Sequence, residues 1–368
     1  MTEESRGRGA RATGRRRKQQ PGHRKALTVA AWGAAGVVLF GGSGLGYLYF
    51  KFNGNIRSVD IDAALGTDRP DNIDNGSMDI LVLGSDSRSG DNSEYGADEG
   101  TARSDTAMVV HVYEGHKKAS IVSIPRDTMV TRPACTTDDG KTDPGGRRVM
   151  FNESYTTGGP ACAVKTVEKM SGTRMDHYIE VDFSGFKEII DKLGGVDITT
   201  TRAIKDTKSR LDLTTGTHTL GGEQALALVR TRKSVGDGSD LGRIQLQQAF
   251  IKALIEQVGD VGVFSNPKKL FDLADTATKA VTADSSLDDV NSLMSFASGL
   301  KGISAANMNM ITLPVRYDPA DPNRVIVLDR ESKQVWSALR LDQPIPASAT
   351  KDSAGDRGET AGIVRSAE

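Results

Sequence analysis

Acidic and basic residues gather in four short segments, each at the end of a predicted strand or the start of a predicted helix. The segments are Gly84-Ser-Asp86-Ser-Arg88, Arg103-Ser-Asp105-Thr106, Ser123-Ile-Pro-Arg126-Asp127, and residues 229–247 with Arg230, Arg232, Asp240, Arg243 and Gln247. Asp86 follows one strand and Asp105 precedes another, so their carboxylates can converge beside a sheet. Mg²⁺ prefers such hard oxygen ligands together with phosphate oxygens and water. The sequence therefore predicts a magnesium site at Asp86 and Asp105.

The arginines of these segments predict an anionic ligand. A single Arg–Asp pair is usually a structural salt bridge of little energetic weight. Six arginines, however, outnumber the acidic residues of these segments and leave positive charge that a bound anion would balance, and planar guanidinium groups hold phosphate oxygens bidentately. Arg243 and Gln247 are also four residues apart, on one face of a predicted helix. The arginines are Arg88, Arg103, Arg126, Arg230, Arg232 and Arg243.

Alternating strands and helices must position these groups. Apolar runs predict strands at 78–84, 106–113, 119–124, 177–182, 196–200, 308–315 and 325–328. Amphipathic spacing predicts helices at 152–170, 183–193, 222–230, 240–258, 270–280, 287–300 and 331–339. Residues 86–104 and 131–148 are expected to be polar loops. The fold class is therefore α/β: a single three-layer α-β-α domain with a central mixed sheet covered on both faces.

The charge pattern predicts membrane topology. Residues 1–25 carry nine basic and two acidic side chains, a net charge of +7, and residues 26–50 carry no charge. Twenty-five uncharged residues can cross a bilayer of roughly 30 Å, and a retained anchor fits better than a cleaved signal because no small-residue cleavage site follows. Basic residues stay on the cytoplasmic side. The catalytic part is then extracellular on a single-pass cell-membrane protein, which argues against nucleic acid as a partner.

The expected organisation is a basic cytoplasmic tail at 1–25, a transmembrane helix at 26–50, a connector at 51–77, a catalytic domain at 78–342 and a disordered tail at 343–368. Two cysteines and five scattered histidines offer no zinc-ligand spacing. Cys135 and Cys162 are instead expected to form a disulfide, because export favours oxidation.

Several motifs in order resemble the LytR–CpsA–Psr family over residues 78–260. They are GSDSR, RSDT, SIPRD, Asn152-x-x-Tyr155, DFSGF at 182–186, LGGVD at 193–197, and ALALVRTRK leading into DLGRIQLQQ. The resemblance implies a phosphotransferase that moves a glycopolymer from a polyprenyl-diphosphate lipid to peptidoglycan, with Mg²⁺ at the diphosphate. It implies that the carboxylates of Asp86 and Asp105 lie beside the metal ion, and that these two residues, Arg103 and Arg126 are catalytic. It further implies that the diphosphate is bound by Arg88, Arg103, Arg126, Arg230, Arg232, Arg243 and Gln247.

Some features stay open at this point. Leu246 stands where the family often has a basic residue, which would remove a phosphate or sugar contact. Aliphatic residues after Phe183 and Ala249 fit either a polyprenyl pocket or ordinary core packing. A pyrophosphatase with water as acceptor and a non-catalytic lipid carrier are alternative functions. A transcriptional attenuator conflicts with the topology, since the one cytoplasmic segment is a short tail. The glycopolymer, the oligomeric state and the general base are not specified, although Asp86 and Asp105 are candidate bases.

Overall fold

The computed structural model describes residues 49–85, 104–137, 139–232, 235, 238–260, 267–351, 353–356 and 362–366. The predicted site residues Asp86, Arg88 and Arg103 lie outside these ranges, as does most of the predicted membrane anchor. Among the helices that are described, none combines the length and the apolar character that a membrane crossing requires. The chain divides after Lys51 into two units, and the fold below is that of the second, Phe52–Glu368.

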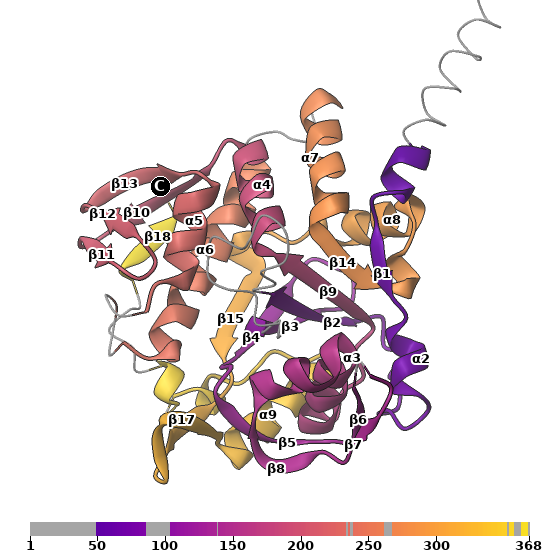
Figure 1. Cartoon of the computed structure of the whole chain (residues 1–368). Helices are drawn as coiled ribbons and strands as arrows, with labels where there is room; N and C mark the ends of the chain where they lie inside the picture. The colour runs from indigo at the N-terminus through magenta and orange to yellow at the C-terminus, as the bar shows by residue number, and fades with distance from the viewer. Residues whose placement is uncertain are drawn as a thin grey trace, which may run out of the picture. The chain divides into compact units, whose positions relative to one another are not determined.

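A mixed sheet forms the centre of the fold (Figure 1). Within the described residues it has seven strands in the order β1-β14-β9-β2-β3-β4-β15. The β2/β3, β3/β4 and β9/β14 pairs are antiparallel, whereas β2/β9, β4/β15 and β1/β14 are parallel. The strands are β1 Arg57–Val59, β2 Met78–Ser85, β3 Ser104–Val112, β4 Ala119–Ile124, β9 His177–Asp182, β14 Val281–Asp284 and β15 Met308–Thr312. All six residues of β4 are buried, as expected for a strand covered on both faces.

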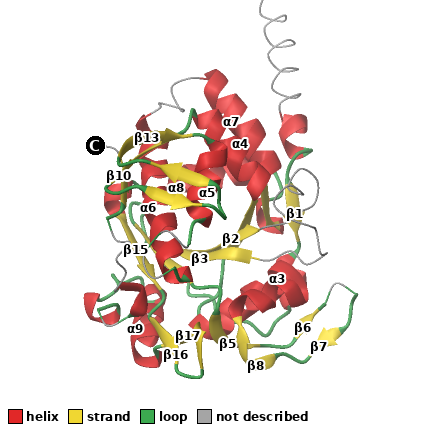
Figure 2. Cartoon of the chain, turned by 60° about the vertical axis from the view of Figure 1, so that its left-hand side comes forward, coloured by secondary structure: helices red, strands yellow, loops and turns green. Residues whose placement is uncertain are grey.

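Helices cover both faces of this sheet (Figures 1 and 2). On one face, α3 (Phe151–Ser171) and α9 (Asp329–Arg340) pack Val167 and Trp336 into a core that includes Leu81 of β2. On the other face, α6 (Asp240–Asp260) contacts the sheet through polar side chains near its start. The predicted three-layer α/β arrangement with a mixed sheet is therefore confirmed.

Helix α4 (Phe183–Leu193) has the bounds that the sequence predicts, because local signals define both of its ends. The Asp182 side chain caps the first turn by accepting a hydrogen bond from the Gly185 amide at 2.8 Å. Gly194 ends the helix in the left-handed conformation, at φ 89°. Gly185 also lets α4 approach α7 (Pro267–Ala280), since a Cβ at this position would lie 2.3 Å from the Cβ of Ala280.

A second core lies between α4, α5 (Gly222–Arg230) and α6 and a small antiparallel sheet, β13-β10-β18. Its strands are β10 Val196–Thr200, β13 Gly216–Leu220 and β18 Val364–Ser366, and the neighbouring hairpin joins β11 Ile204–Asp206 to β12 Leu211–Leu213. Strand β18 falls in the tail predicted to be disordered from residue 343, so that prediction is wrong for this part. Ile363 and Val364 are each 4% exposed and complete the second core. The prediction failed because two apolar residues in an Ala/Ser/Gly/Asp-rich segment are too weak a signal for a strand.

The predicted loop at 131–148 also contains strands. A four-stranded sheet has the order β16-β17-β5-β8, with β5 Thr128–Arg132, β8 Gly146–Met150, β16 Val315–Asp318 and β17 Asp321–Val327. Between β5 and β8, the two-residue strands β6 Cys135–Thr136 and β7 Thr142–Asp143 pair with one another. The sequence does not predict these two strands, because most of their side chains face solvent and are polar, so they lack the apolar pattern of a buried strand. The predicted strand 308–315 is likewise split into β15 and β16 around Leu313-Pro314.

Cys135 and Cys162 form a disulfide between β6 and α3, with their Cα atoms 5.5 Å apart. Helix α3 kinks at Gly158 and Gly159, one turn before Cys162. A side chain at Gly158 would lie 2.6 Å from the Thr136 carbonyl oxygen, so glycine permits the close approach of the disulfide hairpin.

The predicted connector at 51–77 contributes to the domain as well. Strand β1 pairs with β14, and the short helix α2 (Ile61–Leu65) buries Ile61 and Leu65 in the main core. Helix α8 (Val290–Leu300) follows β14 after one turn of 3-10 helix.

Candidate functional site

The site is centred on Asp105 and Arg126, which lie on neighbouring strands of the central sheet. Asp105 is the second residue of β3, and Arg126 follows the end of β4. The Arg126 guanidinium donates a hydrogen bond from Nη1 to the Asp105 carboxylate. Pro125 ends β4 and turns the chain, which places Arg126 beside Asp105 as the sequence predicts.

Asp240 joins a second set of charges to this pair. At the start of α6, its Oδ1 lies 2.5 Å from Nη2 of Arg243, 3.9 Å from Nε of Arg126 and 3.9 Å from Nη2 of Arg232. Its Oδ2 accepts a hydrogen bond from the Arg126 amide at 3.3 Å. A single carboxylate thus faces three guanidinium groups. Carboxylates are favourable at a helix start because of the helix dipole.

Arg243 and Gln247 share one face of α6, as their spacing predicts, and both tie elements together. Arg243 donates from Nη2 to the main-chain oxygen of Asp105 at 2.6 Å. Gln247 donates from Nε2 to Oγ1 of Thr106 at 2.9 Å and to the carbonyl of Val229 at 3.0 Å. Helix α6 therefore links the start of β3 to the end of α5 through these hydrogen bonds.

The acidic neighbours affect the arginines unequally. Burial alone would lower the pKa of Arg126, but Asp105, Asp127 and Asp240 outweigh burial and raise it, whereas the pKa of Arg232 is lowered. Burial and the neighbouring Arg243 and Arg126 cations lower the pKa of Arg232 to about 10. Burial alone would raise the pKa of Asp105, but Arg243, Arg126 and Arg232 outweigh burial and hold it below its ordinary value. Asp105 is therefore ionised, and Arg232 lies in a positive potential that an anion would relieve.

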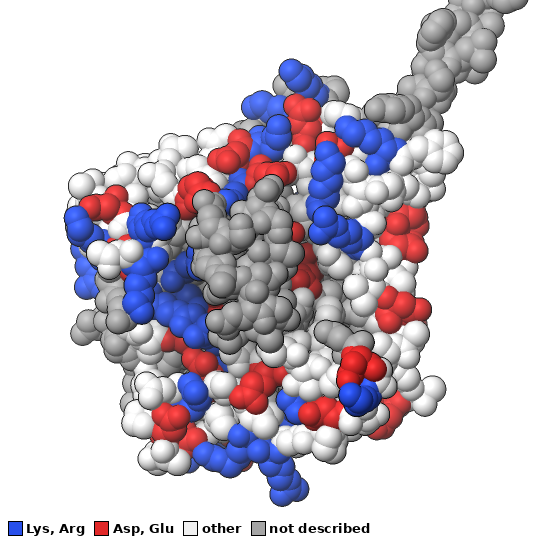
Figure 3. Space-filling view, viewed as in Figure 1, with Lys and Arg blue, Asp and Glu red and all other residues white. Residues whose placement is uncertain are grey.

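Two cavities adjoin these charges. The arginine cavity, of about 350 Å³, is lined mainly by Asp105, Lys208, Arg230, Arg232, Arg243 and Gln247. The Arg230 guanidinium carbon lies 4.9 Å from the centre of the Phe183 ring, a cation–π contact at its wall. Lys and Arg side chains gather on the surface beside α5 and the β11–β12 hairpin (Figure 3). Cations outnumber acids in this cavity, as suits a phosphate ligand.

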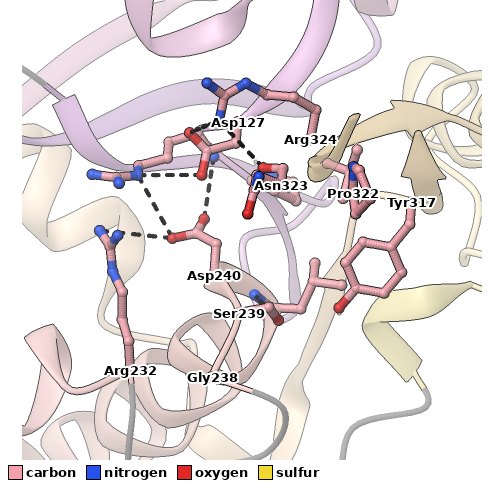
Figure 4. Close-up of a pocket in the computed structure, with 13 residues that line it drawn as sticks. Asp127, Arg232, Gly238, Ser239, Asp240, Tyr317, Pro322, Asn323 and Arg324 are labelled. Carbon is pink, nitrogen blue, oxygen red and sulfur yellow. Dashed lines mark hydrogen bonds and ion pairs between the residues drawn. The ribbon is translucent and has the colours of Figure 1, made fainter. Parts of the chain in front are cut away.

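The hairpin cavity, of about 520 Å³, lies under the turn between β16 and β17. Its walls include Arg126, Asp127, Arg232, Asp240, Tyr317, Asn323 and Arg324 (Figure 4). Arg232 and Gly238 line both cavities.

The structure brings together six of the predicted site residues: Asp105, Arg126, Arg230, Arg232, Arg243 and Gln247. Sequence reasoning assigned no role to Asp127, Lys208, Tyr317, Asn323 or Arg324. Asp127 was visible in the SIPRD segment, whereas no sequence signal marks the other four. Leu246 is fully buried in the second core, so this position faces away from the charged groups. The expected loss of a phosphate contact at Leu246 therefore does not apply.

Of the two predicted magnesium ligands, Asp105 lies within the described residues. Asp105 lines the arginine cavity, and an ionised carboxylate is a ligand that suits a hard cation. Within the described ranges, no three His, Cys, Asp or Glu side chains group as a metal site, and Asp86 lies outside those ranges.

With this geometry in place, comparisons with known proteins define the class. The profile of the LytR_cpsA_psr family matches residues 48–341, and the chain belongs to this family. It is 30% identical to "Cell wall biosynthesis protein LcpA" of Corynebacterium glutamicum, over 92% of this chain and 70% of that protein. It is 32% identical to "Polyisoprenyl-teichoic acid--peptidoglycan teichoic acid transferase TagT" of Bacillus subtilis, over 89% of this chain and 97% of that protein.

Solved structures agree with the fold. The crystal structure of B. subtilis TagV matches with a TM-score of 0.57 and 25% identity, covering 74% of this chain and 100% of that one. A structure of TagT bound to LI-WTA matches with a TM-score of 0.55 and 26% identity, covering 75% of this chain and 96% of that one.

Proposed function

We propose that this protein is a transferase that moves a glycopolymer from a polyprenyl-diphosphate carrier to peptidoglycan during cell wall assembly. Its relatives carry the names of cell wall biosynthesis proteins and of teichoic acid transferases that act on polyisoprenyl-linked substrates. The observation that carries the proposal is the arginine cavity, where Arg230, Arg232 and Arg243 meet around one cavity. Burial and the neighbouring Arg243 and Arg126 cations lower the pKa of Arg232, and a bound anion would stabilise its charged form.

The diphosphate of the donor lipid occupies the arginine cavity. Arg230 and Arg232 present guanidinium groups that match phosphate oxygens bidentately. Arg243 is only 2% exposed and already bonds Asp105 and Asp240, so it acts chiefly by positioning these groups. Arg126 stands where the cavities adjoin, beside Asp105.

The reaction is a phosphoryl transfer. The oxygen of an acceptor sugar hydroxyl bonds to the phosphorus that carries the glycopolymer, and the bond from that phosphorus to the bridging oxygen breaks. Polyprenyl phosphate leaves with that oxygen, and the hydroxyl proton passes to a carboxylate base. Such reactions depend on positioning and charge stabilisation, which clustered arginines supply.

Mg²⁺ is proposed as the cofactor. Asp105 and Asp86 would be its protein ligands, as the resemblance of the GSDSR and RSDT motifs to the family implies. When bound, the ion neutralises charge on the diphosphate oxygens. Arg243, Arg126 and Arg232 lower the pKa of Asp105, which keeps this carboxylate ionised and able to bind a cation.

We also place the protein at the cell membrane, with residues 1–25 in the cytoplasm and the folded unit outside. The support is the net charge of +7 ahead of an uncharged segment of 25 residues. A lipid-linked donor then reaches the site from the membrane in which the protein is anchored.

Transfer of a labelled glycan from a synthetic polyprenyl diphosphate to peptidoglycan fragments tests this function. Asp105→Asn should leave the fold intact by circular dichroism and weaken the response of the rate to added Mg²⁺, because an amide oxygen is a poorer ligand for a hard cation. Release of the glycan phosphate to water, with none on the acceptor, would identify a pyrophosphatase instead. Donor binding without turnover would identify a lipid carrier.

A further inference from the structure

We propose that the hairpin cavity is the acceptor subsite, which binds a carbohydrate chain and delivers its hydroxyl to Asp127. This inference rests on the proposed function, since a transferase needs a second site for the acceptor. The two cavities share Arg232 and Gly238, so a ligand in each would meet at this shared wall. Arg126 lines the hairpin cavity and hydrogen-bonds Asp105, which lines the arginine cavity.

The chemistry of the two cavities differs in the way that a donor and an acceptor differ. The arginine cavity has four cations, Lys208, Arg230, Arg232 and Arg243, against the two carboxylates Asp105 and Asp206. In the hairpin cavity, Arg126, Arg232 and Arg324 face Asp127 and Asp240, and the amide of Asn323 adds a further donor and acceptor. Mixed donors and acceptors with little net charge suit the hydroxyl groups of a sugar rather than a diphosphate.

An aromatic side chain completes the carbohydrate character. Tyr317 is 40% exposed at the cavity wall and belongs to β16. Figure 4 shows its ring on the hairpin side, beside Pro322, with Asp240 and Arg232 on the opposite side. An exposed aromatic face offers an apolar surface with a polar tip, which fits the apolar face of a pyranose ring.

Asp127 is the carboxylate best placed to take the hydroxyl proton. It lines the hairpin cavity, and its nearest cations are Nε of Arg126 at 3.6 Å and Nη1 of Arg324 at 3.9 Å. Asp105 and Asp240 instead make close contacts with arginines, Asp105 with Arg126 and Asp240 with Arg243. In the proposed step, the acceptor oxygen bonds to phosphorus, polyprenyl phosphate departs, and the proton moves to Asp127.

Steady-state kinetics of the full-length protein in detergent separate the two subsites. The donor is a synthetic polyprenyl-diphosphate-linked sugar, and the acceptor is a soluble peptidoglycan glycan fragment. Tyr317→Ala and Asn323→Ala should each raise the KM for the acceptor roughly 3- to 10-fold and leave the KM for the donor unchanged. Tyr317→Phe should restore the acceptor KM, because the ring is retained.

Asp127→Asn tests whether Asp127 accepts the proton of the acceptor hydroxyl. It should lower kcat about 10²- to 10⁴-fold and remove the acidic limb of the pH–rate profile, while donor binding measured by calorimetry stays as in the wild type. A merely structural role would weaken donor binding or the melting temperature and keep the shape of the pH profile.

Arg316→Ala is the matched control. Arg316 precedes Tyr317 on β16, both residues are exposed, and alternation along a strand directs the Arg316 side chain to the other face. Its kinetics should match the wild type. Wild-type transfer with an unchanged acceptor KM in the Tyr317 and Asn323 variants would overturn the acceptor subsite. Absence of transfer by the wild type would refute the proposed function itself, and calorimetric titration of the acceptor fragment would then still decide whether Tyr317 binds glycan.

Discussion

Arg243 donates a hydrogen bond across 2.6 Å to the main-chain oxygen of Asp105, although the two residues lie 138 positions apart. The same guanidinium contacts Asp240 at 2.5 Å, one turn earlier on α6. The Arg243 side chain is 3% exposed, whereas that of Arg126 is 23% exposed. Arg243 therefore ties β3 to α6 from a buried position, whereas the more exposed Arg126 is the one of the two that we propose contacts the ligand.

Replacing each arginine by lysine should separate these two roles. Arg126→Lys keeps the charge but loses the fork geometry, so we expect a loss of about 1.5 to 3 kcal/mol of transition-state stabilisation, roughly 10- to 150-fold in kcat/KM. Its melting temperature should stay near that of the wild type. Transfer assays and thermal melts on the same preparation give both quantities.

Arg243→Lys should lower both activity and stability. Nη2 of Arg243 makes both the contact with the Asp105 carbonyl and the contact with the Asp240 carboxylate. The lysine side chain is shorter, so it should leave at least one of these buried oxygens without its donor, at a cost of about 1 to 3 kcal/mol in unfolding free energy. Denaturant titration measures this loss. A destabilised Arg126→Lys that transfers normally would show that Arg126 is structural and contradict the catalytic assignment.

His111 predicts how stability varies with pH. The ring is fully buried in β3, with Nδ1 2.9 Å from Oδ1 of Asp79 and Nε2 3.1 Å from Oδ1 of Asp342. Burial alone would lower the pKa of His111, but the two carboxylates outweigh burial and raise it. Protonated His111 therefore stabilises the folded protein. This stabilisation is fully present below the histidine pKa of the unfolded chain, about 6.5, and is lost as the pH rises through the higher pKa of the folded protein.

Urea titrations at pH 6 and pH 8.5 test this linkage. The wild type should have the higher unfolding free energy at pH 6. Asp342→Asn should cost about 1.5 to 3 kcal/mol at pH 6 and reduce the difference between the two conditions. Asparagine also adopts the φ of 53° found at Asp342, so the substitution should not add backbone strain to the measured change in stability. Equal pH dependence in the variant would assign the effect to another group.

The disulfide should be measurable by chemistry. Alkylation of the unfolded protein without reduction should label neither Cys135 nor Cys162, and labelling after reduction should reach both. On the entropic account, closing a loop of 27 residues contributes roughly 3 to 4 kcal/mol. The Cys135→Ser/Cys162→Ser protein should unfold correspondingly earlier in denaturant. Labelling of both residues before reduction would exclude the bridge.

A topology reporter tests the membrane placement. Alkaline phosphatase fused after Glu368 should be active, because it folds only outside the cytoplasm, and a cytoplasmic reporter at the same position should be silent. Replacing the arginines at 15–17 by glutamate weakens the positive charge that sets orientation, and should lower the phosphatase signal. Strong cytoplasmic activity of the unaltered fusion would reverse the proposed location of the site.

The sequence predicts most elements with strong local signals and fewer of those that depend on distant partners. Helix α4 and strands β9 and β10 have the predicted bounds because caps, glycines and apolar runs are encoded within each segment. Strand β18 could not be predicted, since three residues become a strand only beside β10. The strands β6 and β7 likewise depend on each other and on the disulfide hairpin.

The candidate site shows the same division. Arg126, Arg232 and Arg243 stand out because charged motifs cluster in the sequence. Arg126 follows the end of β4, Arg232 follows the end of α5, and Arg243 lies in the first turn of α6. Tyr317 and Arg324 carry no such signal. Arg324 reaches Asp127 because β17 pairs with β5, and Tyr317 lines the same cavity from β16. The β17/β5 pairing is a parallel contact between segments about 200 residues apart that only the tertiary fold reveals.

The pairing of β18 with β10 has a consequence for the order of folding. Thr199 pairs with Arg365 and Thr200 with Val364, contacts of very long sequence separation. Closing such a loop is entropically costly, so contacts of this kind form late and slow the search for the native state. The edge of β10 is therefore exposed in early intermediates, and hydrogen exchange should protect its β18-facing amides after those of β2 and β3. During that interval the unpaired edge is where the nascent domain is most open to misassociation.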